Sequence, residues 1–197
     1  IWKTYRRDAA VIHPPVEISR FSLRENKEDF YLTASRLVPY KKIDLIAEAF
    51  TAMPERRLVI IGDGPEIKKV RAKAGSNVTV LGYQPDDVLH DYMQRAKAFV
   101  FAAEEDFGIT PLEAQACGTP VIAYGKGGVL ETIRGLDDKQ PTGVFFAEQS
   151  VQAIKAAVIS FEQEAARILP ATCRNNACLF APERFRSEFM ACVKEEW

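Results

Sequence analysis

The sequence lacks an excess of charge of either sign and lacks a long uncharged run. Its 197 residues contain 26 lysines and arginines against 27 acidic residues, for a formal net charge of −1. Binding to nucleic acid needs clustered positive charge, so this balance predicts no nucleic-acid partner. The two longest stretches without a charged residue, 74–85 and 114–125, are twelve residues long and contain glycine and proline. Neither is long enough to span a bilayer as a helix.

Cysteine and histidine are also scarce. Four cysteines at irregular spacing do not form a disulfide framework in a chain of this length, and they favour reduced thiols in a cytoplasmic protein. Cys173 and Cys178 are not followed by a second pair, and both histidines lie far from them, so the spacing of a zinc site is missing. The chain begins with Ile1 and shows no signal-peptide pattern, which we interpret as a piece of a longer protein.

Hydrophobic residues make up 47% of the chain, which is enough for a buried core. Short β-branched or aromatic runs alternate with amphipathic stretches at intervals of roughly twenty residues, which is typical of βαβ units. We therefore predict an α/β fold with a Rossmann-like open parallel sheet and helices on both faces. The expected strands cover 10–13, 30–34, 58–61, 78–81, 98–102, 120–123 and 143–146, and the expected helices between them cover 42–52, 66–74, 86–95, 110–117 and 129–134.

The pattern changes towards both ends of the chain. Residues 150–168 and 183–196 are amphipathic with helical spacing, and Pro170 and Pro182 separate these two expected helices. Near the start, the run from His13 to Val16 contains two prolines and forces extended backbone, as an entry hinge would. We divide the chain into a linker at 1–16, a sheet domain at 17–170 and C-terminal helices at 171–197.

Open parallel sheets bind ligands where their strands end, so the loops there hold the candidate site. The loop after the first strand of the main sheet lacks the Gly-x-Gly-x-x-Gly pattern, so we expect no nicotinamide cofactor. It carries Arg36 and then Lys41 or Lys42, which suit a diphosphate, although solvated charges on a loop would look the same. The next loop, with Gly62 and Gly64, allows close backbone approach and equally fits a plain tight turn.

The loop after the fourth strand of the main sheet is the most informative. Glu105 stands between two other acidic residues, and such a cluster is tolerated mainly beside a ligand or a cation. The following residues predict a helix start with Thr110 as N-cap, Pro111 at the first helical position and Glu113 at the third. Amides at such a start bind anions. Glu113 either completes this capping box or faces a ligand, and the motif alone leaves both roles open.

These features follow the order of a known family. The run from Glu105 to Ala123, with seven residues between Glu105 and Glu113, resembles the signature of the retaining glycosyltransferase family 4. The segments Ser35 to Lys41, Gly62 to Pro65, Leu81 to Tyr83, Gly127-Gly128 with Glu131, and Thr142-Gly143 extend the resemblance to nearly the whole chain. It implies the donor-binding, carboxyl-terminal half of a GT-B fold. Residues 1–16 would then be the remnant of the interdomain linker, and 171–197 would pack toward a missing amino-terminal domain.

The resemblance also implies roles for single residues. Arg36 and Lys41 would bind the donor diphosphate and stabilise the departing phosphate, with Lys42 as the substitute if the loop is shifted by one. Glu105 would face the donor sugar as the third catalytic residue, and Glu113 would hold the ribose hydroxyls. The implied donor-binding residues are Gly62, Gly64, Tyr83, Phe107, Gly108, Ile109, Thr110 and Glu113. No Asp-x-Asp motif occurs, so we expect no metal ion and no cofactor.

The implied activity is transfer of a hexose, with mannose from GDP-mannose as the first choice, to a glycan or lipid-linked acceptor. Retention by a carboxylate nucleophile or by same-face attack assisted by the donor phosphate stays open, with the resemblance favouring the second. Two alternatives are a nucleotide-sugar epimerase of GT-B fold and a noncatalytic nucleotide-sugar binding domain. Without the amino-terminal domain we expect this fragment to be inactive alone. Peripheral contact with the inner face of a membrane would come through that missing half.

Overall fold

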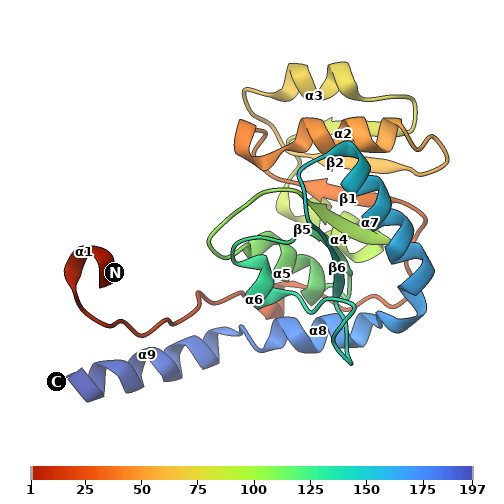
Figure 1. Cartoon of the computed structure of the whole chain (residues 1–197). Helices are drawn as coiled ribbons and strands as arrows, with labels where there is room; N and C mark the ends of the chain where they lie inside the picture. The colour runs from red at the N-terminus through yellow and green to blue at the C-terminus, as the bar shows by residue number, and fades with distance from the viewer. Residues whose placement is uncertain (1, 197) are drawn as a thin grey trace.

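A six-stranded parallel sheet forms the centre of the computed structural model, which describes residues 2–196 (Figure 1). The strands are arranged in the order β3-β2-β1-β4-β5-β6. Four of them, β1, β2, β4 and β5, are buried along their whole length, as expected of parallel strands covered on both faces. The predicted α/β, Rossmann-like fold is therefore confirmed. The strands span Tyr31–Ala34 (β1), Leu58–Ile61 (β2), Val78–Gly82 (β3), Ala98–Phe101 (β4), Val121–Tyr124 (β5) and Gly143–Phe146 (β6).

Helices pack on both faces of this sheet because alternate strand residues point to opposite sides. In β4, Val100 joins the core beneath α2 and α7, whereas Phe99 joins the core beneath α4 and α5. The helices are α1 (Trp2–Tyr5), α2 (Ile43–Thr51), α3 (Ile67–Lys73), α4 (Asp86–Arg95), α5 (Ile109–Ala116), α6 (Val129–Thr132), α7 (Val151–Glu164), α8 (Pro170–Cys178) and α9 (Pro182–Glu196), with short 3₁₀ turns η1 (Ile18–Arg20), η2 (Pro39–Lys41) and η3 (Ala165–Arg167).

Two sequence-based expectations about elements are wrong. The stretch 10–13 forms no strand, and Val11 is 77% exposed there. It precedes Pro14 and Pro15, which have no N–H to donate to a ladder. Pro170, taken as a break, is instead the first residue of α8, because the first helical position needs no intrahelical N–H bond. The sequence analysis missed this helix.

The last two helices differ in how they contact the sheet domain. Helix α8 packs against α5, and Asn176 on α8 donates hydrogen bonds to the side chain of Gln115 and the carbonyl of Thr132. Helix α9 continues from α8 and extends away from the sheet, on the side where the amino-terminal segment also lies (Figure 1). The boundaries at 16 and 170 stay predictions.

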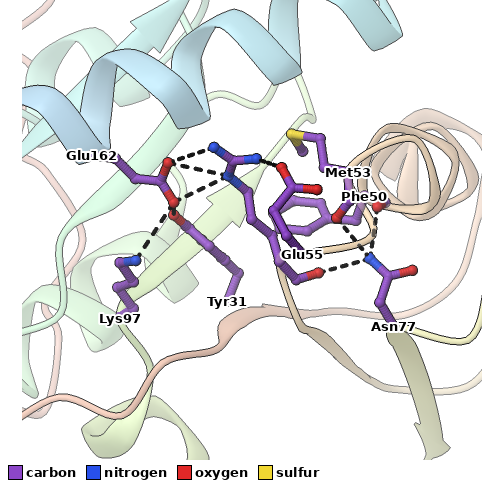
Figure 2. A network of polar contacts seen from close by, with 8 residues as sticks. Tyr31, Phe50, Met53, Glu55, Asn77, Lys97 and Glu162 are labelled. Carbon is purple, nitrogen blue, oxygen red and sulfur yellow. Dashed lines mark hydrogen bonds and ion pairs between the residues drawn. The ribbon is translucent and has the colours of Figure 1, made fainter.

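A polar network occupies the amino-terminal edge of the sheet (Figure 2). Glu162 on α7 accepts hydrogen bonds from the Tyr31 hydroxyl at 2.7 Å and from Nη2 of Arg56 at 2.7 Å. Lys97 lies 3.5 Å from the same carboxylate, and the Arg56 carbonyl accepts a bond from Asn77. Tyr31, Arg56 and Lys97 each stand at or just before the start of a strand. The network therefore fixes α7 at the edge opposite to the strand ends that hold the candidate site.

Candidate functional site

Two adjoining hollows lie at the carboxyl ends of β1, β2 and β4, and Thr110 lines both. The first, which we call the Glu113 pocket, has a volume of about 360 Å³. Its walls include Ser35 and Arg36 after β1, Gly62 and Asp63 after β2, and Glu113 on α5. The second, the Glu105 pocket, has a volume of about 490 Å³ and includes Tyr40, Lys41, Glu105 and Phe107. All four candidate charged residues thus lie along one edge of the sheet.

Glu113 is one of three acidic residues that line the first pocket, with Asp63 and Asp86. Burial raises the pKa of its carboxyl group, the positive charge of Arg20 lowers it, and the negative charge of Asp86 raises it again. Within residues 2–196, no hydrogen bond or ion pair to this carboxylate is found. Its oxygens can therefore accept hydrogen bonds from a ligand that enters the pocket.

The predicted capping box at the start of α5 is wrong. The helix begins at Ile109, with Gly108 as N-cap at a φ of 85°, so Thr110 is already inside the first turn. Glycine adopts this left-handed conformation without a steric cost, which lets the helix start earlier than the Thr110-Pro111 pattern indicated. The Glu113 side chain consequently does not form a capping box with Thr110. A ligand-facing role remains for it.

The two candidate cations of the first loop separate into the two pockets. Arg36 is exposed and lines the Glu113 pocket, whereas Lys41 lies in the Glu105 pocket and forms an ion pair with Glu105. Lys42 has a left-handed backbone, and its side chain lines a different hollow with Glu104 and Gln149. Lys41, rather than Lys42, is therefore the lysine beside Glu105.

The glycines after β2 allow one loop to pack tightly on another. A Cβ atom at Gly62 would lie 1.8 Å from the carbonyl oxygen of Ser35, and one at Gly64 would lie 2.5 Å from that of Leu37. The Leu37 amide also donates to the carbonyl of Asp63 at 2.9 Å. Gly62 lines the Glu113 pocket, while Gly64 is not among its lining residues and packs against the backbone of Leu37 in the loop that carries Arg36.

The outer wall of the Glu113 pocket comes from β3 and α4. Tyr83, which is 75% exposed, and Gln84 follow β3, and Asp86 opens α4. Asp86 forms an ion pair with Arg20 at 2.8 Å. Arg20 and Asp86 were not predicted from the sequence, because a contact between residues 66 positions apart leaves no local pattern.

The loop from Glu105 to Gly108 is supported from behind. Phe107, Gly108 and Ile109 all line the Glu105 pocket, and their predicted contact with the donor stays a prediction. The Gly128 amide donates to the Glu105 carbonyl at 2.7 Å, and a Cβ atom at Gly128 would lie 2.2 Å from the Cα of Phe107. This amide therefore positions Glu105.

Residues just before the sheet domain also contact this loop. The His13 ring stacks on Phe107 with centroids 5.4 Å apart, and its Nε2 lies 3.2 Å from a carboxylate oxygen of Glu131. The His13 carbonyl accepts a hydrogen bond from Arg184 on α9 at 3.0 Å. His13 and Arg184 thus support Phe107, which lines the Glu105 pocket.

Within residues 2–196, no group of three His, Cys, Asp or Glu side chains is placed to hold a metal ion. No helix there has both the length and the hydropathy that a membrane span requires.

Comparison with known proteins places the chain in a family. Residues 16–179 match the family model described as glycosyl transferases group 1. The chain belongs to this family. As a group 1 glycosyl transferase, it is similar to D-inositol 3-phosphate glycosyltransferase of Mycobacterium avium, with 29% identity over 146 residues that cover 63% of this chain and 34% of that protein.

A second relative of this group 1 chain is the GDP-mannose-dependent monoacylated alpha-(1-6)-phosphatidylinositol monomannoside mannosyltransferase of Corynebacterium glutamicum. It is 34% identical over 114 residues, covering 50% of this chain and 30% of that protein. Among solved structures, sucrose-phosphate synthase from Thermosynechococcus elongatus superimposes with a TM-score of 0.81 at 22% identity, covering 98% of this chain and 55% of that chain. The matched region therefore spans only about a third of the length of these two relatives.

Proposed function

We propose that this chain is the donor-binding domain of a retaining glycosyltransferase that holds a nucleotide-diphosphate sugar across the two pockets. The observation that carries the proposal is the arrangement of four charges along one edge of the sheet. Arg36 and the half-buried Glu113 line one pocket, and the Lys41–Glu105 pair lies in the next. The Glu113 carboxylate accepts from the two ribose hydroxyls, the diphosphate lies between Arg36 and Lys41, and the sugar occupies the Glu105 pocket.

This placement supplies the stabilisation that transfer requires. Cleavage of the sugar–phosphate bond leaves negative charge on the diphosphate, and fixed cations beside it lower the barrier. Arg36 and Lys41 provide those cations, and the amino terminus of α5 adds its dipole at the same edge. We favour same-face attack on the sugar, with the departing phosphate assisting the acceptor.

GDP-mannose is the donor that we propose. The Corynebacterium glutamicum relative is named as GDP-mannose-dependent, and the Glu113 pocket carries Asp63 and Asp86. Guanine presents an N–H group beside an amino group, and one carboxylate can accept a hydrogen bond from each of them. Uracil presents a single N–H group between two carbonyl oxygens, and a carboxylate is repelled by these oxygens. Carboxylates on the pocket wall therefore favour the guanine base.

The acceptor and its binding site lie outside this chain in our proposal. We propose that a glycan or lipid-linked acceptor binds to an amino-terminal domain, that residues 1–16 link that domain to the sheet domain, and that 171–197 pack toward it. Helix α9 has exposed apolar side chains available for such packing, among them Phe189 and Met190. That domain would also bring the cytoplasmic enzyme to the membrane surface.

Calorimetric titration of the chain with GDP-mannose, UDP-glucose, GDP and UDP tests the proposal. We expect GDP-mannose to bind with a dissociation constant of about 10–500 μM, and UDP-glucose to bind at least about tenfold more weakly. The constant is modest because half of the interdomain cleft is absent. If none of the four ligands binds, the proposed function is wrong; transfer of mannose to an acceptor by this chain alone would contradict the half-enzyme assignment.

A further inference from the structure

The ion pair between Lys41 and Glu105 is shielded from water. The two side chains are 16% and 22% exposed, and the Lys41 ammonium lies 5.3 Å from the centre of the Tyr40 ring and 5.9 Å from that of Phe101. A pair in such surroundings is screened less by solvent than a surface pair. Separating Lys41 from Glu105 therefore leaves a carboxylate that needs a new partner.

The backbone around Glu105 holds its carboxylate in this place. The Gly128 amide binds the Glu105 carbonyl, and Glu105 pairs with Gly127 as an isolated bridge. Lys41, in contrast, ends the η2 turn on a long side chain with freely rotating bonds. When a ligand enters, the lysine is thus the partner that moves.

The diphosphate of the nucleotide sugar proposed above binds the same ammonium group of Lys41. We expect a diphosphate to draw the Lys41 ammonium group away from Glu105, because the two anions compete for its three N–H donors. A nucleotide sugar brings hydroxyl groups that can donate to the vacated carboxylate. A nucleoside diphosphate brings no such sugar hydroxyl, since the hydroxyls of its ribose bind Glu113 in the proposed arrangement.

We propose that Glu105 makes the site prefer a nucleotide sugar over the nucleoside diphosphate left after transfer, because a sugar hydroxyl replaces the Lys41 ammonium as the partner of its carboxylate. This inference rests on the proposed function. Glu105 then weakens binding of the product and leaves binding of the donor nearly unchanged. The pair also gives the Lys41 ammonium group a partner while the pocket holds no ligand.

Titration of four variants with GDP and GDP-mannose tests this role. Glu105→Gln keeps the size of the side chain and removes its charge, so GDP should bind about tenfold more tightly and GDP-mannose less than about threefold more tightly. Glu104→Gln is the matched control, since it removes the charge of the neighbouring residue, whose side chain is exposed. It should change both constants by less than about threefold. In a Lys41→Gln background, adding Glu105→Gln should change the GDP constant by less than about threefold.

The outcomes separate this inference from the function on which it rests. If GDP and GDP-mannose bind the wild type but Glu105→Gln changes both constants equally, or weakens GDP, the discrimination role of Glu105 is wrong and the donor-binding function stands. Equal effects of Glu104→Gln and Glu105→Gln would reduce the role to the net charge of the pocket, which also overturns it. If no nucleotide binds to the wild type or to Glu105→Gln, both proposals fall together. Thermal unfolding of each variant confirms that it is folded.

Discussion

Replacement of Arg36 by alanine should weaken binding of GDP and GDP-mannose by about 10- to 150-fold, or about 1.5–3 kcal/mol. Arg36 is exposed at the mouth of the Glu113 pocket, and within residues 2–196 no ion pair involves it. Its guanidinium group can therefore donate two parallel hydrogen bonds to phosphate oxygens. Arg36→Lys should recover part of the affinity, since the charge remains and the planar fork is lost. Calorimetric titration measures these constants.

Arg57→Ala is the control for Arg36→Ala. Arg57 is also an exposed arginine, but it precedes β2 at the opposite edge of the sheet. It should leave nucleotide binding unchanged within about twofold, because charges at that distance are screened by salt. Equal losses of affinity in Arg36→Ala and Arg57→Ala would mean that binding depends only on the net charge of the protein and that Arg36 does not contact the ligand.

Glu162→Gln should lower the free energy of unfolding by about 2–3 kcal/mol at pH 7. The carboxylate of Glu162 is a quarter exposed, and it is shared by Tyr31, Arg56 and Lys97 (Figure 2). Glutamine keeps one acceptor oxygen but removes the negative charge that faces Arg56 and Lys97, and it leaves the more exposed Glu55 as the acidic partner of Arg56. Denaturant unfolding of the variant and of the wild type gives the difference.

Glu164→Gln supplies the comparison for this change. Glu164 lies on the same helix two residues further on, and its pair with Arg167 is at the surface. Such a surface pair contributes less than about 1 kcal/mol, so this variant should unfold within about 0.5 kcal/mol of the wild type. A similar loss in both variants would indicate a general effect on α7 instead of the network at Glu162.

The contribution of Glu162 should also depend on pH. Burial raises the pKa of this carboxyl group, but hydrogen bonds from Arg56 and Tyr31 and the nearby positive charges outweigh burial, so the net pKa is lowered from the ordinary value of 4.5. A lowered folded-state pKa gives stability that is present above the ordinary value and is lost as the pH falls through the folded-state value. The difference between the wild type and Glu162→Gln should therefore shrink below pH 4.5. A difference that stays constant down to acid pH would contradict this.

Much of the fold follows from the sequence because the signal is local. Strands such as Leu58–Ile61 and Gly143–Phe146 are continuous apolar runs between helical stretches, and the structure confirms both ranges. The stretch 10–13 had the same apolar character but adjoins two prolines, so it could not join a ladder. Helix α8 was missed because a proline reads equally as a helix break and as a helix start.

The candidate site follows from the sequence only in part. Parallel strands bring their carboxyl ends to one edge, which places residues 36, 41, 105 and 113 near one another. Their division into two pockets depends on the Lys41–Glu105 pair, and the start of α5 depends on the φ of Gly108. Neither feature has a sequence pattern, and the stacking of His13 on Phe107 joins residues from distant parts of the chain.

Amide NMR spectra recorded while GDP-mannose is added to the chain would locate the ligand most directly. We expect the largest chemical-shift changes at Ser35, Arg36, Gly62 and Thr110, where the loops after β1 and β2 meet the start of α5. The amides around Arg56 and Lys97, at the opposite edge of the sheet, should shift little. Changes that concentrate at that opposite edge, or spectra that do not change at all, would contradict binding of a nucleotide sugar across the Glu113 and Glu105 pockets.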